Sequence, residues 1–205
     1  MAYSSNRNKK INTQYFQDLT ETYKKSIQTK ETVDIITFVE AKWGLNTELF
    51  PVQRFILKVF YGLELDDENK TILLPDETNV RVIGEYTEKE FMQYLIDTGR
   101  TNLLSYEPGR ARQNLLLNAG RRGTKSSITG FISNYETYKL IKMGNPQKHF
   151  GMPDGSEISV TVTAPTIETA TTLFTTMKNY CMSCNYLKDR VVGKSATTFT
   201  LSTDI

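Results

Sequence analysis

Apolar side chains recur every three or four positions over several stretches of the N-terminal half, which is the spacing of one helical face. The stretches predicted to be amphipathic helices are residues 13–28, 31–43, 51–62 and 88–98. Gly44 is expected to end the second helix, because glycine accepts the left-handed conformation that often follows a helix. Pro51 is expected to begin the third, because the first helical turn does not need its missing N–H.

The pattern changes after the third helix. Residues 63–87 are predicted to be short extended pieces around turns, with 80–83 as the best strand. Leu115-Leu116-Leu117 is a short, wholly apolar run, typical of a strand that is buried on both faces of a parallel sheet. The chain is then predicted to continue as a helix at 126–143, an alternating strand at 157–163, a helix at about 167–182 and a strand at 196–201. This alternation predicts a parallel α/β sheet flanked by helices and preceded by a helical N-terminal segment.

Composition narrows the class of protein. A chain of 205 residues with 39% hydrophobic and 23% charged residues has the size of one large domain, or of one domain with a small appendage. No apolar run approaches the ~20 residues of a membrane span, and the N-terminus lacks the apolar core of a secretory signal. The net charge is only +2, so a contact with DNA would need a local basic patch.

The stretch Ala119-Gly-Arg-Arg-Gly-Thr-Lys-Ser-Ser127 lies between the apolar run and the following helix, the setting of a phosphate-binding P-loop. The backbone N–H groups of such a loop surround an anion. Lys125 is expected to reach the β and γ phosphates of ATP, and the Ser126 hydroxyl is expected to bind Mg²⁺. The predicted nucleotide contacts are Ala119, Gly120, Gly123, Thr124, Lys125, Ser126 and Ser127. The alternative is an ordinary basic turn between a strand and a helix.

Arg121 and Arg122 form an unusual pair inside this loop. One guanidinium is expected to stabilise charge on the transferred phosphoryl group, as an arginine finger does, so both residues are candidates for catalysis together with Lys125. The other could form a salt bridge or contact a DNA phosphate. The alternative is that both are solvated surface arginines.

Two further short motifs lie outside the loop. Gln53 lies in the first turn of the helix expected to begin at Pro51, after Leu49-Phe50, and its amide offers one acceptor and two donors to the edge of adenine. The alternative is a capped helix with Gln53 in solvent. Ala164-Pro165-Thr166 follows the second predicted strand, and capping of the next helix is the favoured role of the Thr166 hydroxyl.

Other polar residues carry weaker signals. Cys181 and Cys184 have CxxC spacing, but His149 is the only histidine, too few ligands for a zinc site of the usual kind. A redox motif opens a helix, whereas this pair closes one, so two reduced thiols in a reducing cytoplasm are the favoured interpretation. Residues that could contact DNA phosphates, or simply be solvated, are Arg7, Lys9, Lys10, Arg110 and Arg112.

Taken in order, Leu49-Phe-Pro-Val-Gln53, Leu115-Leu-Leu-Asn-Ala-Gly-Arg-Arg-Gly-Thr-Lys-Ser-Ser127 and Val160-Thr-Val-Thr-Ala-Pro-Thr166 resemble the ATPase domain of phage large terminase subunits. The resemblance covers residues 31–205 and implies a RecA-like P-loop ATPase domain, with residues 1–30 as an N-terminal arm and helix. The family loop usually has Ser-Gly before the lysine, where this chain has Gly123-Thr124.

The resemblance implies a function and partners. Large terminase subunits use ATP and Mg²⁺ to drive double-stranded DNA into a preformed capsid. They dock on the portal protein as a ring of identical subunits and work with a small terminase subunit. The expected location is the host cytoplasm, transiently at the portal vertex of the procapsid, and not the mature virion or a membrane. A nuclease domain normally follows the ATPase, and none is expected in this chain.

The acidic motif that such an ATPase needs is missing from the sequence. The sequence after Lys125 contains no run of four apolar residues followed by Asp-Glu. It also has no other convincing strand that ends in an acidic residue to hold Mg²⁺. Asp204 follows a half-polar segment and is not accepted. The ATPase domain is therefore expected to be incomplete before this strand, and the chain alone could be inactive. The alternatives are a superfamily-two helicase or another nucleic-acid-dependent ATPase, and a nucleotide-binding module without catalysis.

Overall fold

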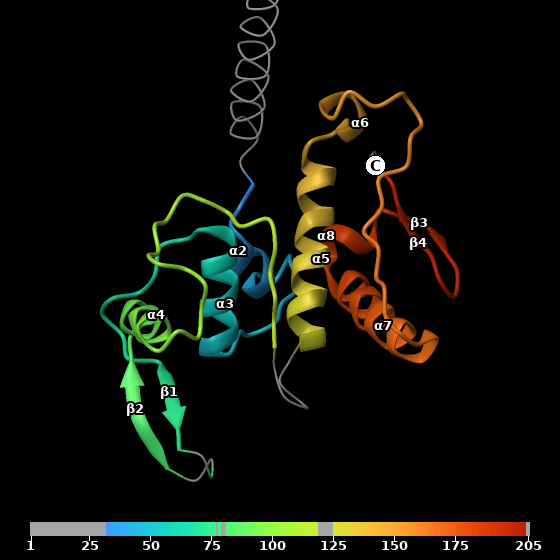
Figure 1. The fold of residues 1–205 in the computed structure, drawn as a ribbon. Helices are drawn as coiled ribbons and strands as arrows, with labels where there is room; N and C mark the ends of the chain where they lie inside the picture. Colours follow the sequence, from blue (N-terminus) through green and yellow to red (C-terminus); the bar gives the residue numbers. More distant parts are fainter. Residues whose placement is uncertain (1–31, 77, 79–80, 119–124, 204–205) are drawn as a thin grey trace, which may run out of the picture.

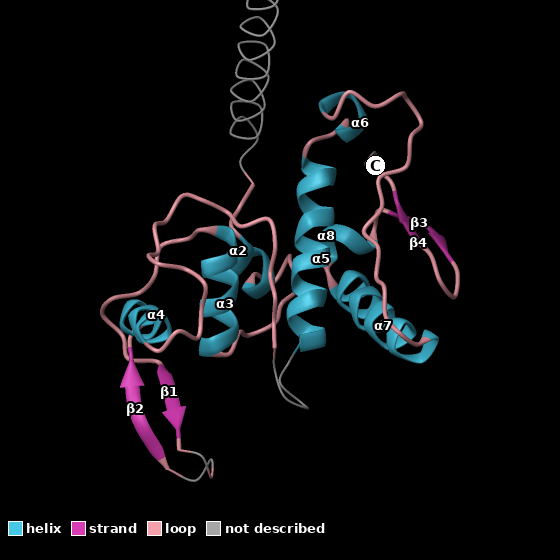
Figure 2. Cartoon of the chain, in the orientation of Figure 1, coloured by secondary structure: helices cyan, strands magenta, loops and turns pink. Residues whose placement is uncertain are grey.

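The computed structural model describes residues 32–76, 78, 81–118 and 125–203 and contains helices together with two small β-hairpins (Figures 1 and 2). The elements in chain order are α2 (Ile35–Glu40), α3 (Pro51–Tyr61), β1 (Ile72–Pro75), β2 (Val82–Tyr86), α4 (Glu88–Asp97), α5 (Lys125–Lys142), α6 (Pro146–His149), α7 (Ile167–Ser183), α8 (Asn185–Lys188), β3 (Val191–Lys194) and β4 (Phe199–Leu201).

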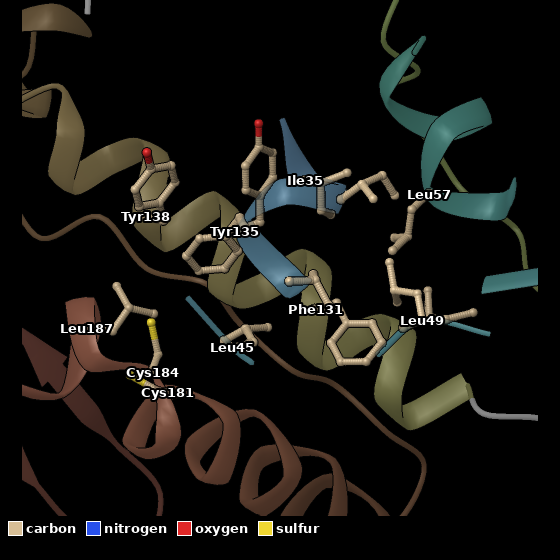
Figure 3. Close-up of a cluster of buried hydrophobic side chains, with 14 of the residues drawn as sticks. Ile35, Leu45, Leu49, Leu57, Phe131, Tyr135, Tyr138, Cys181, Cys184 and Leu187 are labelled. Atoms are coloured by element: carbon tan, nitrogen blue, oxygen red, sulfur yellow. The ribbon is translucent and has the colours of Figure 1, made fainter. Parts of the chain in front are cut away.

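The main core gathers along one face of α5. The largest side chains buried on this helix recur at intervals of three or four residues: Ile128, Phe131, Tyr135, Tyr138 and Ile141. That spacing places them on one stripe of the helix. Figure 3 shows the stripe meeting side chains from α2, α3 and the junction of α7 with α8, including Ile35, Leu57 and Cys184. Each such side chain contributes about 1.5–3 kcal/mol when fully buried.

The short helix α2 is almost completely enclosed. Ile35, Ile36, Phe38 and Val39 are all buried, and a helix that is apolar nearly all round belongs in the interior. The ring of Phe38 stacks on the ring of Tyr138 with centroids 4.8 Å apart. This contact joins α2 to the centre of α5.

The helix predicted at 31–43 is confirmed in its centre but is shorter at both ends. Asp34 caps its start by accepting the Thr37 N–H at 2.9 Å. Its end comes before Trp43, because the chain turns back and the Leu45 N–H donates to the Phe38 carbonyl at 3.1 Å. A Cβ on Gly44 would lie 1.9 Å from that same oxygen, so the glycine permits the turn rather than ending a longer helix.

Helix α3 separates the main core from a second, smaller one. Leu57 faces the main core, whereas Phe55 joins Leu65, Ile72 and Met92 in the cluster beneath α4 and the first hairpin. A partly buried ion pair connects α3 to α4, with Lys58 Nζ 2.6 Å from the buried Glu88 Oε2. The same carboxylate accepts the Asp66 N–H at 2.7 Å, which satisfies a charge that would be costly to bury alone.

A hydrogen bond also connects α3 to α5. The Tyr61 hydroxyl donates to Glu136 Oε1 at 2.6 Å. Burial of the Tyr61 phenol and the neighbouring Glu136 carboxylate both raise the pKa of Tyr61 above its usual value. The phenol therefore keeps its proton at neutral pH and remains a donor.

Helices α5 and α7 pack directly on each other. A Cβ on Gly130 would lie 2.7 Å from the Tyr180 ring, so the missing side chain allows this close approach. Asn134 Nδ2 then donates to the carbonyls of Gly130 in its own helix, at 2.8 Å, and of Met177 in α7, at 3.1 Å. No sheet separates the two helices at this crossing.

The parallel sheet predicted from the sequence is not found among the described residues. Residues 115–117 and 157–163 are irregular chain rather than strands, and Leu116 is 96% exposed instead of buried. No backbone hydrogen bond joins either segment to another part of the chain that the structure describes. A strand is stabilised by its neighbours, and the described residues supply no neighbour for these two runs.

The strands that are present form two antiparallel hairpins. β1 pairs with β2, and β3 pairs with β4. The expected strand at 80–83 is instead Val82–Tyr86, and the one at 196–201 is Phe199–Leu201. The latter is therefore the return strand of a hairpin and not a member of a parallel sheet, because Val191–Lys194 immediately before it supplies an antiparallel partner.

The remaining predicted helices within the described residues are confirmed. They are α3, α4, α5 and α7, each within about two residues of its expected bounds. The predicted arm and helix at 1–30 lie outside the described residues. None of the described helices combines the length and hydropathy of a membrane crossing.

Gly62 lies at the contact between the end of α3 and the segment that leads toward the predicted phosphate loop. It caps α3 in the left-handed conformation, with φ of 68°. The Gly109 N–H donates to the Gly62 carbonyl at 2.7 Å, and a Cβ on Gly62 would lie 2.5 Å from the backbone carbon of Arg110. Any side chain there would push this segment away.

We therefore expect Gly62→Ala to lower the free energy of unfolding. The left-handed conformation costs alanine roughly 1–2 kcal/mol, and the overpacking adds roughly 1–3 kcal/mol. Gly99→Ala is the matched control, because Gly99 has φ of 64° but nothing within 4 Å of its added Cβ. Urea denaturation of both variants measures the difference. Equal losses in the two variants would contradict the proposed backbone contact.

Candidate functional site

The described part of the predicted phosphate loop is the beginning of α5. Lys125 is the first residue of this 18-residue helix and is exposed, while Ser126 and Ser127 are half-buried. The first turn of any α-helix has N–H groups without helical partners, which favour an anion. The predicted contacts Ala119, Gly120, Arg121, Arg122, Gly123 and Thr124 lie outside the described residues.

The first turn of α5 is anchored in the core directly behind these residues. Ile128 is buried and belongs to the main cluster together with Phe131. The Thr129 hydroxyl donates to the Lys125 carbonyl at 3.0 Å. The start of the helix is thus held on one side by packing and presents Lys125 on the other.

The beginning of α3 is part of the same cluster. Leu49, which comes just before α3, is buried with Ile128 and Phe131, and Figure 3 shows Leu49 beside Phe131. The Leu49 N–H donates weakly to Glu40 Oε1 at 3.4 Å, and the same oxygen pairs with Arg54. The segment just before Gln53 is therefore packed in the same core cluster as Ile128 and Phe131, near the first turns of α5.

Gln53 itself acts as a helix cap. Its side-chain oxygen accepts the Phe50 N–H at 3.1 Å, and the residue is only 5% exposed. Of the alternative to base recognition, a capped helix with Gln53 in solvent, the cap is present, but the side chain is buried and not in solvent. A carbonyl oxygen has two lone pairs, so the cap does not by itself remove the amide from base recognition.

Phe50 is the residue that sequence reasoning did not single out. Its side chain is 68% exposed, although the backbone N–H of the same residue is held by Gln53. An exposed aromatic ring on a fixed backbone offers a stacking surface. The sequence signal was an aromatic residue directly before the proline that begins the helix.

Thr166 behaves as the predicted cap of α7. Its hydroxyl oxygen accepts the Thr169 N–H at 3.3 Å, and it lies 2.9 Å from the Thr169 hydroxyl. α7 contacts α5 through Met177 and Tyr180, about three helical turns after Thr166. The Ala-Pro-Thr turn therefore lies at the start of α7, away from the point where α7 crosses α5.

The two cysteines are part of the main core. Cys181 and Cys184 are buried, and Cys184 Sγ lies 3.8 Å from the Trp43 carbonyl oxygen. Burial, and then the neighbouring Cys184, raise the pKa of the Cys181 thiol to about 12, so the thiol remains protonated at neutral pH. Within the described residues, His, Cys, Asp and Glu form no group that could hold a metal ion.

The basic residues proposed for DNA contact are only partly described. Arg110 is exposed and Arg112 is half-buried, with the Arg112 N–H donating to the Phe60 carbonyl at 2.7 Å. Arg7, Lys9 and Lys10 lie outside the described residues. Of this set, Arg110 is the described side chain most accessible to a phosphate.

We expect Gln53→Ala to have two separable effects. Loss of the cap should lower the free energy of unfolding by about 0.5–2 kcal/mol. If the amide also contacts the base, ATP affinity should fall more than GTP affinity, by about 1–3 kcal/mol. Gln53→Glu is the control for the cap, because it keeps the acceptor but loses the amide donors. Calorimetric titration with both nucleotides, together with urea denaturation, measures the two effects, and equal loss for ATP and GTP would remove Gln53 from the base pocket.

Comparison with known families identifies the class of domain. Residues 100–202, just over half of the chain, match the family described as "Uncharacterized protein MJ0330, N-terminal P-loop domain". Comparisons with curated proteins and with solved structures gave no match. The matched range includes the loop before α5 and α5 itself, which supports a nucleotide-binding α/β domain at the site described above. The chain therefore belongs to this family of P-loop domains.

Proposed function

We propose that the chain binds ATP with Mg²⁺ at the beginning of α5. The observation that carries the proposal is the exposed Lys125 at the first position of a long helix whose first turn is anchored by Ile128. The helix N-terminus and Lys125 favour the phosphates, and Ser126 is the residue that would hold Mg²⁺. The family match to a P-loop domain supports the same assignment.

The base of the nucleotide would be held at the beginning of α3. Phe50 exposes its ring there, and aromatic rings stack on the flat face of a base. Gln53 fixes the backbone of Phe50 and can add its amide to the base edge. The shared burial of Leu49 and Ile128 supports a single site formed by the two helix starts.

The proposed biological role is that of a viral DNA-packaging motor. In this role ATP hydrolysis drives double-stranded DNA into a procapsid, with the chain acting as part of a large terminase subunit on the portal, together with a small subunit. The order of the glutamine motif, the arginine-pair loop and the Ala-Pro-Thr turn supports this role. Arg121 or Arg122 would stabilise the transferred phosphoryl group. The work would take place in the host cytoplasm at the portal vertex.

We expect Lys125→Ala to abolish MgATP binding, because it removes the charge that faces the β and γ phosphates. Lys148→Ala is the matched control, since Lys148 is also exposed but lies on α6. Isothermal titration calorimetry of the parent and both variants measures the affinity. The phosphate-loop assignment fails if Lys125→Ala binds MgATP as tightly as the parent.

DNA binding separates the motor from a helicase-like ATPase. We expect the chain in the presence of MgATP to bind blunt double-stranded DNA better than single-stranded DNA, because a packaging motor moves along a duplex. Fluorescence anisotropy at several salt concentrations measures both affinities. A clear preference for single strands would favour the superfamily-two alternative, and no binding to either would favour a nucleotide-binding module.

A further inference from the structure

Two hairpins with open edges lie at opposite ends of the molecule. The β1–β2 hairpin projects beyond α4, and the β3–β4 hairpin lies on the far side of α5 and α7 (Figure 1). Among the described residues, each is a sheet of only two strands, so the outer edge of each has backbone groups without a neighbouring strand in that part of the chain. A two-stranded hairpin is marginally stable alone in water, and open edges are templates for pairing with another chain.

Both hairpins expose apolar β-branched side chains. Ile83 on β2 is 65% exposed, with Val82 and Leu73 exposed beside it, and Val192 on β3 is 68% exposed. Strands in contact with solvent on one face usually present polar residues there. Exposed apolar side chains next to open edges are typical of a surface that pairs with another strand.

The two hairpins have opposite charge. Residues 72–86 contain three acidic residues and one basic residue, whereas residues 188–201 contain three basic residues and one acidic residue. The sequence around each hairpin has the same sign of net charge as the hairpin itself. Residues 63–100 contain ten acidic and four basic residues, whereas residues 101–205 contain twelve basic and seven acidic residues. Within the described part of the chain, neither Glu85 nor Lys194 forms an ion pair.

We propose that a second copy of this chain occupies these surfaces, with the acidic β1–β2 hairpin of one copy pairing with the basic β3–β4 hairpin of the next. Charge complementarity selects unlike hairpins, because like hairpins would repel each other. Since the two surfaces differ and lie at opposite ends, the contact is heterologous, and each copy keeps one free hairpin for a further copy. The contact uses no residue of the nucleotide site.

Charge reversal tests the pairing. Glu85→Lys and Lys194→Glu should each weaken self-association of the full chain about tenfold or more, measured by sedimentation velocity over a range of protein concentrations. The double variant Glu85→Lys/Lys194→Glu should restore association, because it reverses both charges together. Lys148→Glu, at an exposed position on α6, is the matched control and should associate like the parent.

Substitution of the exposed apolar side chains tests the same contact without a change of charge. Ile83→Thr and Val192→Thr keep the β-branched shape that the strands need while making the exposed surface polar, and each should weaken association. Leu104→Thr, at another highly exposed position outside both hairpins, should have no effect. Circular dichroism confirms that each variant is folded.

These association measurements test the hairpin contact without depending on nucleotide binding. A parent chain that stays monomeric at all accessible concentrations overturns the proposal. Association that is unchanged in each of the two single charge-reversal variants also overturns it, as does a double variant that fails to recover association. Lys125→Ala should associate like the parent, so failure of nucleotide binding and failure of the hairpin contact can be told apart.

Discussion

Burial of the apolar stripe of α5 is the constraint on which the described structure depends. Ile128, Phe131, Tyr135, Tyr138 and Ile141 lie on one face, and every large element of the main core packs on that face or beside it. Because these residues are large and spaced by three or four positions, the helix can lose their contact with water only by meeting several partners at once. The short helix α2 supplies the central partner, with Phe38 stacked on Tyr138.

The same stripe determines where polar groups can lie. A helix buried at Ile128 must present the preceding turn at the edge of the core, which leaves Lys125 exposed at the helix start. Leu49 enters the core at this level and carries the beginning of α3 with it. In this position Gln53 is buried and its side chain accepts the Phe50 N–H. The side chain therefore has a structural role beside any contact with a base.

The strands show how local pattern and tertiary context compete. The apolar run Leu115–Leu117 has the composition of a buried parallel strand, yet Leu116 is almost fully exposed and the segment forms no described backbone pairing. Hydrogen bonds of a parallel ladder come from neighbours distant in sequence, whereas a hairpin such as β3–β4 obtains them from residues a few positions away. The close packing of Gly130 against Tyr180 then joins α5 to α7 without an intervening sheet.

The sequence by itself determined the amphipathic helices, the end of α3 near Gly62, the Thr166 cap and the helix that begins around Lys125, because each depends on residues within a few positions of one another. Most of those features are present in the described chain, and the family match supports the P-loop class. Only the tertiary structure decided that Gln53 is buried, that Phe50 is exposed, that α2 ends before Trp43 and that the strands pair as antiparallel hairpins. These depend on which distant side chains fill the core and which backbone groups find partners, and no local pattern contains that information.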